Sequence, residues 1–84
     1  MRISVAMAVY QGSRYLHEQM DSILMQCLPD DQIVCSCDPS TDGSWELLQA
    51  YARQDARVQL YQGPGQGVVA NFEHALQQCV GDVI

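Results

Sequence analysis

The chain has 84 residues, of which 48% are hydrophobic, and its net charge at pH 7 is −6 with no lysine and four arginines. This balance excludes a basic stripe that could follow a nucleic-acid backbone, and it argues against docking on anionic lipid. The length allows one small core, so we expect a single domain over residues 1–84 without a linker.

The first half of the chain alternates between strand-like and helical patterns. Residues 2–9 form a nearly continuous apolar run, which is typical of a strand buried on both faces. Apolar residues then recur at helical spacing from Leu16 to Cys27, and Pro29 ends this predicted helix. Residues 32–37 form a second apolar run, which predicts a second buried strand.

The second half continues the alternation. A helical pattern begins at Ser44, and residues 57–61 alternate as in a strand near the edge of a sheet. Residues 68–79 predict a third helix that Gly81 ends, and residues 82–84 begin a fourth strand. The order βαβαβαβ predicts an α/β domain with a Rossmann-like parallel sheet. The fourth strand is short, so we interpret the chain as part of a longer α/β protein.

The apolar runs do not suggest a membrane span, and the cysteines do not suggest a metal site. No apolar run reaches the ~20 residues of a membrane span, and residues 1–12 resemble a first strand more than a signal peptide. We therefore expect a cytoplasmic protein whose four cysteines stay reduced. Cys35 and Cys37 alone do not make a zinc site, so we expect them to pack in the core and expect no bound metal.

In open parallel sheets, ligands bind beyond the carboxyl ends of the strands. The first strand ends at Tyr10, and the second is followed by Asp38, so these residues should line one crevice if the strands are neighbours. The Asp38 carboxylate suits a ligand N–H or hydroxyl. It could equally cap a turn by accepting backbone N–H groups around Ser40 and Thr41, and the pattern alone leaves both interpretations open.

Three further features lie next to this crevice. Ser40, Thr41 and Asp42 are predicted to cap the second helix. The glycine-rich segment 63–67 precedes a helix but lacks the lysine of a phosphate-binding loop, so a turn leading into the helix is the favoured interpretation. Asn71, on the third helix, faces either a ligand or water.

Three segments of the chain resemble, in order and spacing, the opening blocks of family 2 glycosyltransferases, which have the GT-A fold. The third block leans toward the rhamnosyltransferase-like members. The segments are ISVAMAVYQGSRYLHEQMDSILMQ, IVCSCDPSTDGSWELLQAYA and QGPGQGVVANFEHALQQCVGDVI.

The resemblance implies an enzyme that moves a sugar, with inversion, from a nucleotide-sugar to an acceptor hydroxyl in polysaccharide or cell-envelope glycan synthesis. Tyr10 matches the residue that packs near the nucleotide base, and Asp38 matches the acid that accepts a hydrogen bond from the pyrimidine N3–H. Uracil and thymine supply this donor and cytosine does not, so the expected donor is a UDP- or dTDP-sugar. Further expected site residues are Ala8 and Val9 beside the nucleotide, and Gln11, Ser40 and Asn71 in the donor site.

The chain departs from the family pattern at three positions: Cys37 replaces the first acid of an Asp-Asp pair, Pro39 replaces Gly or Asn, and Gln11 replaces Asn. The family's Asp-x-Asp, which holds Mg²⁺ or Mn²⁺, and its general base fall beyond Ile84. We therefore expect the full enzyme to need a metal and a glycan or lipid-linked acceptor, and to lie in the cytoplasm, peripheral to the inner face of the membrane. The 84 residues alone should be inactive and bind no metal.

Two alternatives compete with this interpretation. One is a non-catalytic module that holds a nucleotide or a protein partner, and the other is a different doubly wound domain, which would need a better phosphate loop than Gln11-Gly12-Ser13. The open last strand also predicts self-association through an exposed sheet edge.

Overall fold

A computed structural model describes residues 3–83 and contains the predicted alternation of four strands and three helices. The elements are β1 (Ile3–Val9), α1 (Ser13–Gln26), β2 (Gln32–Cys37), α2 (Ser44–Gln54), β3 (Val58–Gln62), α3 (Val68–Gln77) and β4 (Asp82–Val83). The α/β fold class is thereby confirmed, and Ile84, the last residue of the predicted fourth strand, lies outside the described residues.

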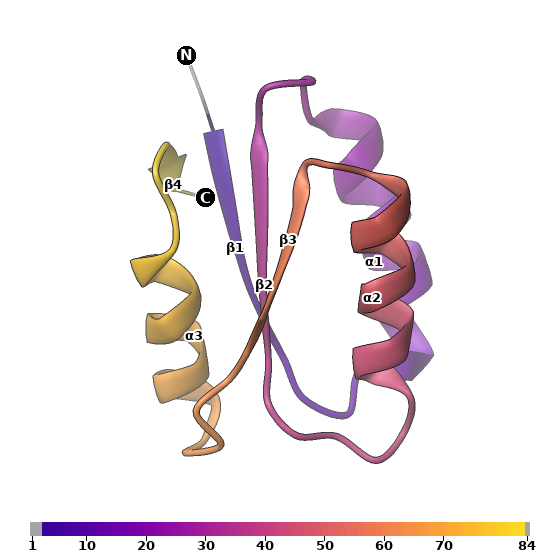
Figure 1. Ribbon diagram of the computed structural model, residues 1–84, viewed down its shortest axis with the longest axis vertical. Helices are drawn as coiled ribbons and strands as arrows, with labels where there is room; N and C mark the ends of the chain where they lie inside the picture. Colours follow the sequence, from indigo (N-terminus) through magenta and orange to yellow (C-terminus); the bar gives the residue numbers. More distant parts are fainter. Residues whose placement is uncertain (1–2, 84) are drawn as a thin grey trace.

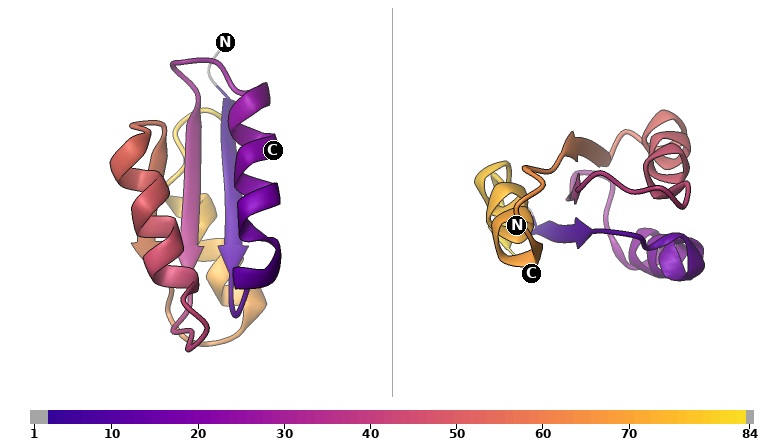
Figure 2. Two further views of the ribbon diagram at one scale, coloured as in Figure 1. Left: turned by 90° about the vertical axis from the view of Figure 1, so that its right-hand side faces the viewer. Right: turned by 90° about the horizontal axis from the view of Figure 1, so that it is seen from below.

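The four strands form one parallel sheet in the order β3-β2-β1-β4. Helices α1 and α2 cover one face of this sheet, and α3 covers the other (Figure 1). The two further views show the same three layers (Figure 2). This is a Rossmann-like arrangement, and β3 lies at an edge, as its alternating sequence predicts.

The core lies on both sides of β2, all six residues of which are buried. Ile33 and Cys35 of β2 belong to one apolar cluster with Leu16 and Met20 of α1 and Leu48 of α2. Burial of such side chains contributes about 1.5–3 kcal/mol each, which explains why two apolar runs fix the centre of so small a sheet. No helix within residues 3–83 is long and apolar enough to cross a membrane.

At two helix ends, long side chains from distant parts of the chain bind the last carbonyls or the amide that follows. Helix α1 ends at Gln26, where Nη1 of Arg57 donates hydrogen bonds to the carbonyls of Leu24 (3.2 Å) and Cys27 (2.8 Å). A cation at this position complements the helix dipole.

Helix α3 ends at Gln77, four residues before the Gly81 that was predicted to end it. The prediction was wrong because a residue of β2 ends the helix. The buried Gln32 side chain donates from Nε2 to the Gln78 carbonyl (3.0 Å) and accepts from the Val80 amide at Oε1 (3.0 Å).

Candidate functional site

The carboxyl ends of β1, β2 and β3 meet at one edge of the sheet, the lower edge in Figure 1. Backbone hydrogen bonds fix their register at this edge: the Asp38 amide donates to the Val9 carbonyl (2.9 Å), and the Gly63 amide donates to the Cys37 carbonyl (2.8 Å). Three loops therefore begin side by side, and they comprise residues 10–12, 38–43 and 63–67.

Asp38 lies at the centre of these loops, and only 5% of its surface is exposed. Its Oδ1 atom accepts a hydrogen bond from the Gly65 amide (2.9 Å), so the carboxylate reaches across to the third loop. The turn predicted around Ser40 and Thr41 is instead formed from the other side, because the Ser40 hydroxyl donates to the Asp38 carbonyl (2.9 Å). A carboxylate offers about four acceptor positions, so the Gly65 amide leaves most of this capacity for a ligand.

Two hollows flank Asp38 and Pro39. The first, the Tyr10 hollow, has a volume of about 390 Å³. It confirms that Tyr10 and Asp38 line one crevice, and Tyr10 is 63% exposed there. Its lining residues are Tyr10, Asp38, Pro39, Gly65, Gly67 and Val68.

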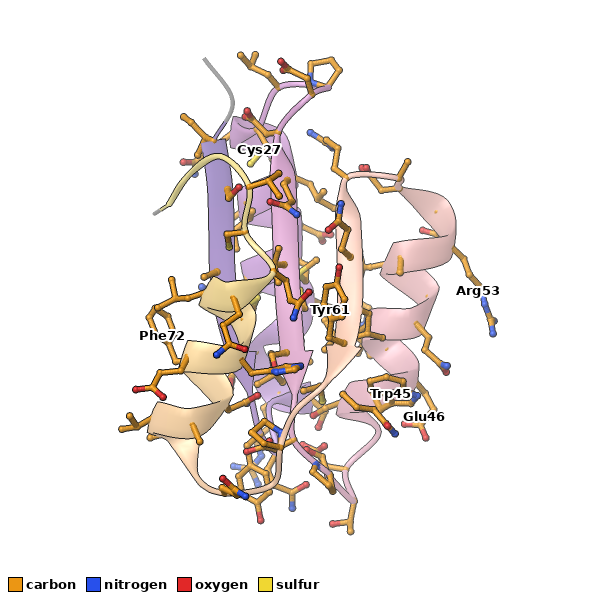
Figure 3. All side chains as sticks on the ribbon, turned by 60° about the vertical axis from the view of Figure 1, so that its left-hand side comes forward. Cys27, Trp45, Glu46, Arg53, Tyr61 and Phe72 are labelled. Atoms are coloured by element: carbon orange, nitrogen blue, oxygen red, sulfur yellow. The ribbon has the colours of Figure 1, made fainter. Side chains whose placement is uncertain are left out.

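The second, the Trp45 hollow, has a volume of about 320 Å³ and lies toward α2 and β3. Trp45 and Glu46 line it together with Ser40 and Gln62. Figure 3 shows Trp45 and Glu46 next to each other at the start of α2. The Trp45 side chain packs against the core cluster, and its position in the first turn of α2, next to the loop, also exposes it to this hollow.

Gly63 permits the close approach of the third loop to Asp38. A Cβ atom at this position would overlap Oδ1 of Asp38 and Oδ1 of Asn71, and it would lie 3.0 Å from the Asp38 amide nitrogen. The loop then leads into α3 at Gly67, whose φ of 100° suits glycine. The interpretation of this segment as a turn leading into a helix is confirmed.

Asn71 is 1% exposed and forms hydrogen bonds within the protein. Its Nδ2 donates to the Val9 carbonyl (3.1 Å), and its Oδ1 accepts from the Ser36 hydroxyl (2.6 Å). The interpretation of a water contact is therefore wrong for this side chain, whereas the donor-site contact stays a prediction. Asn71 instead fastens α3 to β1 and β2. Its spacing of four residues from the buried Ala75 was the signal that placed it on the inner face.

The first two loops are joined through Gln11, which is exposed and has a positive φ of 50°. Its amide donates to the Ser40 hydroxyl (3.0 Å), and its Oε1 accepts from the Thr41 amide (2.7 Å). Of the residues predicted for the donor site, Ser40 lines the Trp45 hollow and Ala8 is half-buried in β1. Val9 has a buried side chain, and its carbonyl accepts a hydrogen bond from the Asp38 amide.

The N-cap of the second helix is Gly43, without a side-chain cap, so the predicted capping by Ser40, Thr41 or Asp42 is wrong. Asp42, one residue earlier, instead accepts a hydrogen bond from the first amide of the helix, whereas Ser40 and Thr41 bond to Gln11. Oδ1 of Asp42 accepts the Ser44 amide (3.1 Å) and hydroxyl (2.5 Å), and Oδ2 accepts the Ser13 amide (3.0 Å). These donors, the Ser44 hydroxyl first, hold the pKa of Asp42 well below its usual range. The contact with Ser13 at the start of α1 was not predicted from the sequence.

Cys35 and Cys37 are buried in the core cluster, which confirms their predicted packing role. Burial raises the pKa of both thiols, that of Cys35 to about 12, so they remain protonated and unreactive. Within residues 3–83, no three His, Cys, Asp or Glu side chains lie together in a way that could hold a metal ion.

Comparison with known proteins identifies the family. Putative glycosyltransferase EpsE of Bacillus subtilis is 32% identical over 85 residues, covering 99% of this chain and 31% of that protein. Glycosyltransferase GlyG of Streptococcus pneumoniae is 35% identical over 72 residues, covering 86% and 24% of the two chains. The poly(ribitol-phosphate) beta-glucosyltransferase of Bacillus spizizenii is 35% identical over 60 residues, covering 69% and 10%.

The chain thus spans about a third or less of the length of these curated relatives. Residues 4–84 match the family model described as glycosyl transferase family 2. This match extends over almost the whole sequence and includes every loop of the candidate site, and the chain belongs to glycosyltransferase family 2.

Proposed function

We propose that the Tyr10 hollow binds the pyrimidine nucleotide of a UDP- or dTDP-sugar. We further propose that the protein containing these 84 residues transfers the sugar to an acceptor hydroxyl with inversion. The observation that carries the proposal is the Asp38 carboxylate, which is 5% exposed and lines a hollow of about 390 Å³. This volume lies within the range of small-molecule sites.

Asp38 and Tyr10 supply complementary chemistry. A buried carboxylate with spare acceptor positions makes a charge-assisted hydrogen bond to the N3–H of uracil or thymine, whereas cytosine has an acceptor at this position. The exposed ring of Tyr10 offers a face on which a base can stack. The choice of nucleotide would therefore be made by Asp38, and Tyr10 would add affinity for any base.

The residues described here do not fit the metal that the family uses. Mg²⁺ and Mn²⁺ prefer several oxygen ligands, and Asp38 is the only carboxylate that lines the Tyr10 hollow among the described residues. We therefore propose that residues outside these 84 hold the metal and provide the general base. The 84 residues alone would then show no sugar transfer and no nucleotide-sugar hydrolysis, and measured turnover would contradict this.

The acceptor and location are also part of the proposal. One relative is named a poly(ribitol-phosphate) beta-glucosyltransferase, which supports a glycan or lipid-linked acceptor in cell-envelope polysaccharide synthesis. The four free cysteines support a reducing compartment, so we place the protein in the cytoplasm, peripheral to the inner face of the membrane.

The substitution Asp38→Asn tests the base contact. Asparagine keeps an oxygen for the Gly65 amide but loses the charge, and it adds an N–H that can donate to cytosine N3. We expect UDP affinity, measured by titration calorimetry, to fall about 10- to 100-fold, because hydrogen bonds to charged groups contribute about 1.5–3 kcal/mol. CDP affinity should fall less or rise.

The matched control is Asp30→Asn, an exposed acid in the turn before β2, at the opposite end of the sheet. It should leave the affinities for both nucleotides unchanged. Unaltered UDP affinity in the Asp38→Asn variant, or no UDP binding by the wild-type protein, would rule out the proposed site.

A further inference from the structure

Five hydrogen bonds join the loop after β1 and the start of α1 to the loop after β2 and the start of α2. They connect Gln11, Gly12 and Ser13 on one side with Ser40, Thr41, Asp42 and Ser44 on the other. Tyr10 and Asp38, which line the Tyr10 hollow, are close in sequence to these contacts. Tyr10 directly precedes Gln11, and Asp38 lies two residues before Ser40.

The inner part of this connection is formed by Asp42 and Ser44. Ser44 is fully buried, and its hydroxyl accepts the Gly12 amide (2.8 Å) and donates to Oδ1 of Asp42 (2.5 Å). The two Asp42 oxygens accept the Ser13 and Ser44 amides, which are the first amides of α1 and α2. One carboxylate thus satisfies unpaired N–H groups of two helices and complements the positive ends of both. Asp42 therefore fixes the position of the first residue of α1 relative to the first residue of α2.

The outer part is formed by Gln11. Its positive φ is unfavourable for a residue with a Cβ atom. The strained conformation is held by the bonds from its amide to Ser40 and between its side chain and Thr41. Ser40 in turn donates to the Asp38 carbonyl. The direction in which the chain leaves Tyr10 is therefore coupled to the backbone at Asp38.

We propose that Gln11, Asp42 and Ser44 are positioning residues for the Tyr10 hollow, which hold Tyr10 and Asp38 in the binding arrangement before the nucleotide arrives. This inference rests on the proposed function. None of the three lines the hollow as the structure describes it, so they act through Tyr10 and Asp38. Ordering each side chain or loop upon binding would otherwise reduce affinity, and a site that is already ordered avoids this cost.

The variant Gln11→Gly separates positioning from stability. Glycine accepts a positive φ without strain, which offsets the lost side-chain bonds, so the melting temperature should stay close to that of the wild type. UDP affinity should fall about fivefold, because Tyr10 then has to be ordered upon binding. A merely structural role for Gln11 predicts no change in UDP affinity.

The variant Asp42→Asn provides a second test, with Asp55→Asn as its matched control. Asp55 accepts the amide of Arg57 (3.0 Å) with the same two-residue spacing, but it lies at the opposite end of the sheet. Both variants should lower the melting temperature. At a temperature where each variant is fully folded, only Asp42→Asn should weaken UDP binding, by about five- to tenfold.

UDP binding by the wild-type and Asp38→Asn proteins shows whether the proposed function fails or only the positioning role does. If the wild type does not bind UDP, the proposed function and this inference both fail. If UDP binds and depends on Asp38, but Gln11→Gly and Asp42→Asn bind it as the wild type does, only the positioning role is overturned.

Discussion

Asp38 and Asp42 show how two acids of one loop take different roles. Asp42 is exposed, yet its two oxygens accept three hydrogen bonds from Ser13 and Ser44. Asp38 is buried, and the Gly65 amide is its one donor in the described residues. Exposure alone would therefore misjudge which carboxylate is available to a ligand. Remaining acceptor capacity is the better criterion, and it favours Asp38.

Asp31 gives the protein a pH-dependent contact at the end of the sheet opposite the proposed nucleotide site. Its oxygens accept the amides of Leu28 (2.8 Å) and Ile3 (3.1 Å), and these bonds, that of Leu28 first, hold the pKa of Asp31 below its usual range. A carboxylate with a lowered folded-state pKa stabilises the protein above the unfolded pKa of about 3.9. This stabilisation is lost as the pH falls through the folded-state pKa.

The substitution Asp31→Ala should therefore lower the melting temperature at pH 7, and its difference from the wild type should shrink toward pH 3. Circular dichroism melts at several pH values measure this, and the neighbouring exposed acid supplies the control, since Asp30→Ala should change little at any pH. A difference between Asp31→Ala and the wild type that stays constant from pH 7 to pH 3 would contradict the role given to the charge.

At the scale of elements, the sequence predicted the order of all seven and most of their limits. Buried parallel strands are continuous apolar runs, and helices repeat their apolar positions, so both leave local signals. The end of α3 left no such signal, because it is set by Gln32, which is 46 residues before Gln78. The contact of Asp42 with Ser13 was equally invisible, since it depends on how two loops meet after folding.

Asn71 and Ser36 join α3 to the centre of the sheet, and their coupling can be measured. Asn71→Ala removes the donor to the Val9 carbonyl and leaves the Ser36 hydroxyl buried without its acceptor, which should cost about 1–3 kcal/mol in urea unfolding. The double variant with Ser36→Ala should cost less than the sum of the single variants, because the unpaired hydroxyl is gone.

The control for this cycle is Glu73→Ala, an exposed position on the same helix, which should stay within about 0.5 kcal/mol of the wild type. Strict additivity of Asn71→Ala and Ser36→Ala would show that the two side chains do not act as a pair, despite the 2.6 Å between their oxygens.

At the scale of the whole molecule, the sheet edge formed by β1 and β4 is only partly paired in the described residues. Strand β4 pairs only with Ile3 and Ser4 of β1, so within the described residues the outer edge of β1 beyond Ser4 has no strand partner. Helix α3 and the turn after it also expose apolar side chains. Among them, Phe72 projects from α3 on the side away from β3 (Figure 3). These exposed residues are Val68, Val69, Phe72, Leu76 and Val80. An open edge and an exposed apolar surface both favour association.

We therefore predict that the 84 residues self-associate, and that Phe72→Glu shifts them toward the monomer in sedimentation velocity measured over a series of concentrations. The added charge alone would increase repulsion in a chain of net charge −6, so a control must add the same charge elsewhere. Met25→Glu does so at an 87% exposed position on α1, in the opposite layer. If association uses the α3 surface, only Phe72→Glu should reduce it. Equal effects would assign the change to net charge, and a monomeric wild type would remove the basis for the prediction.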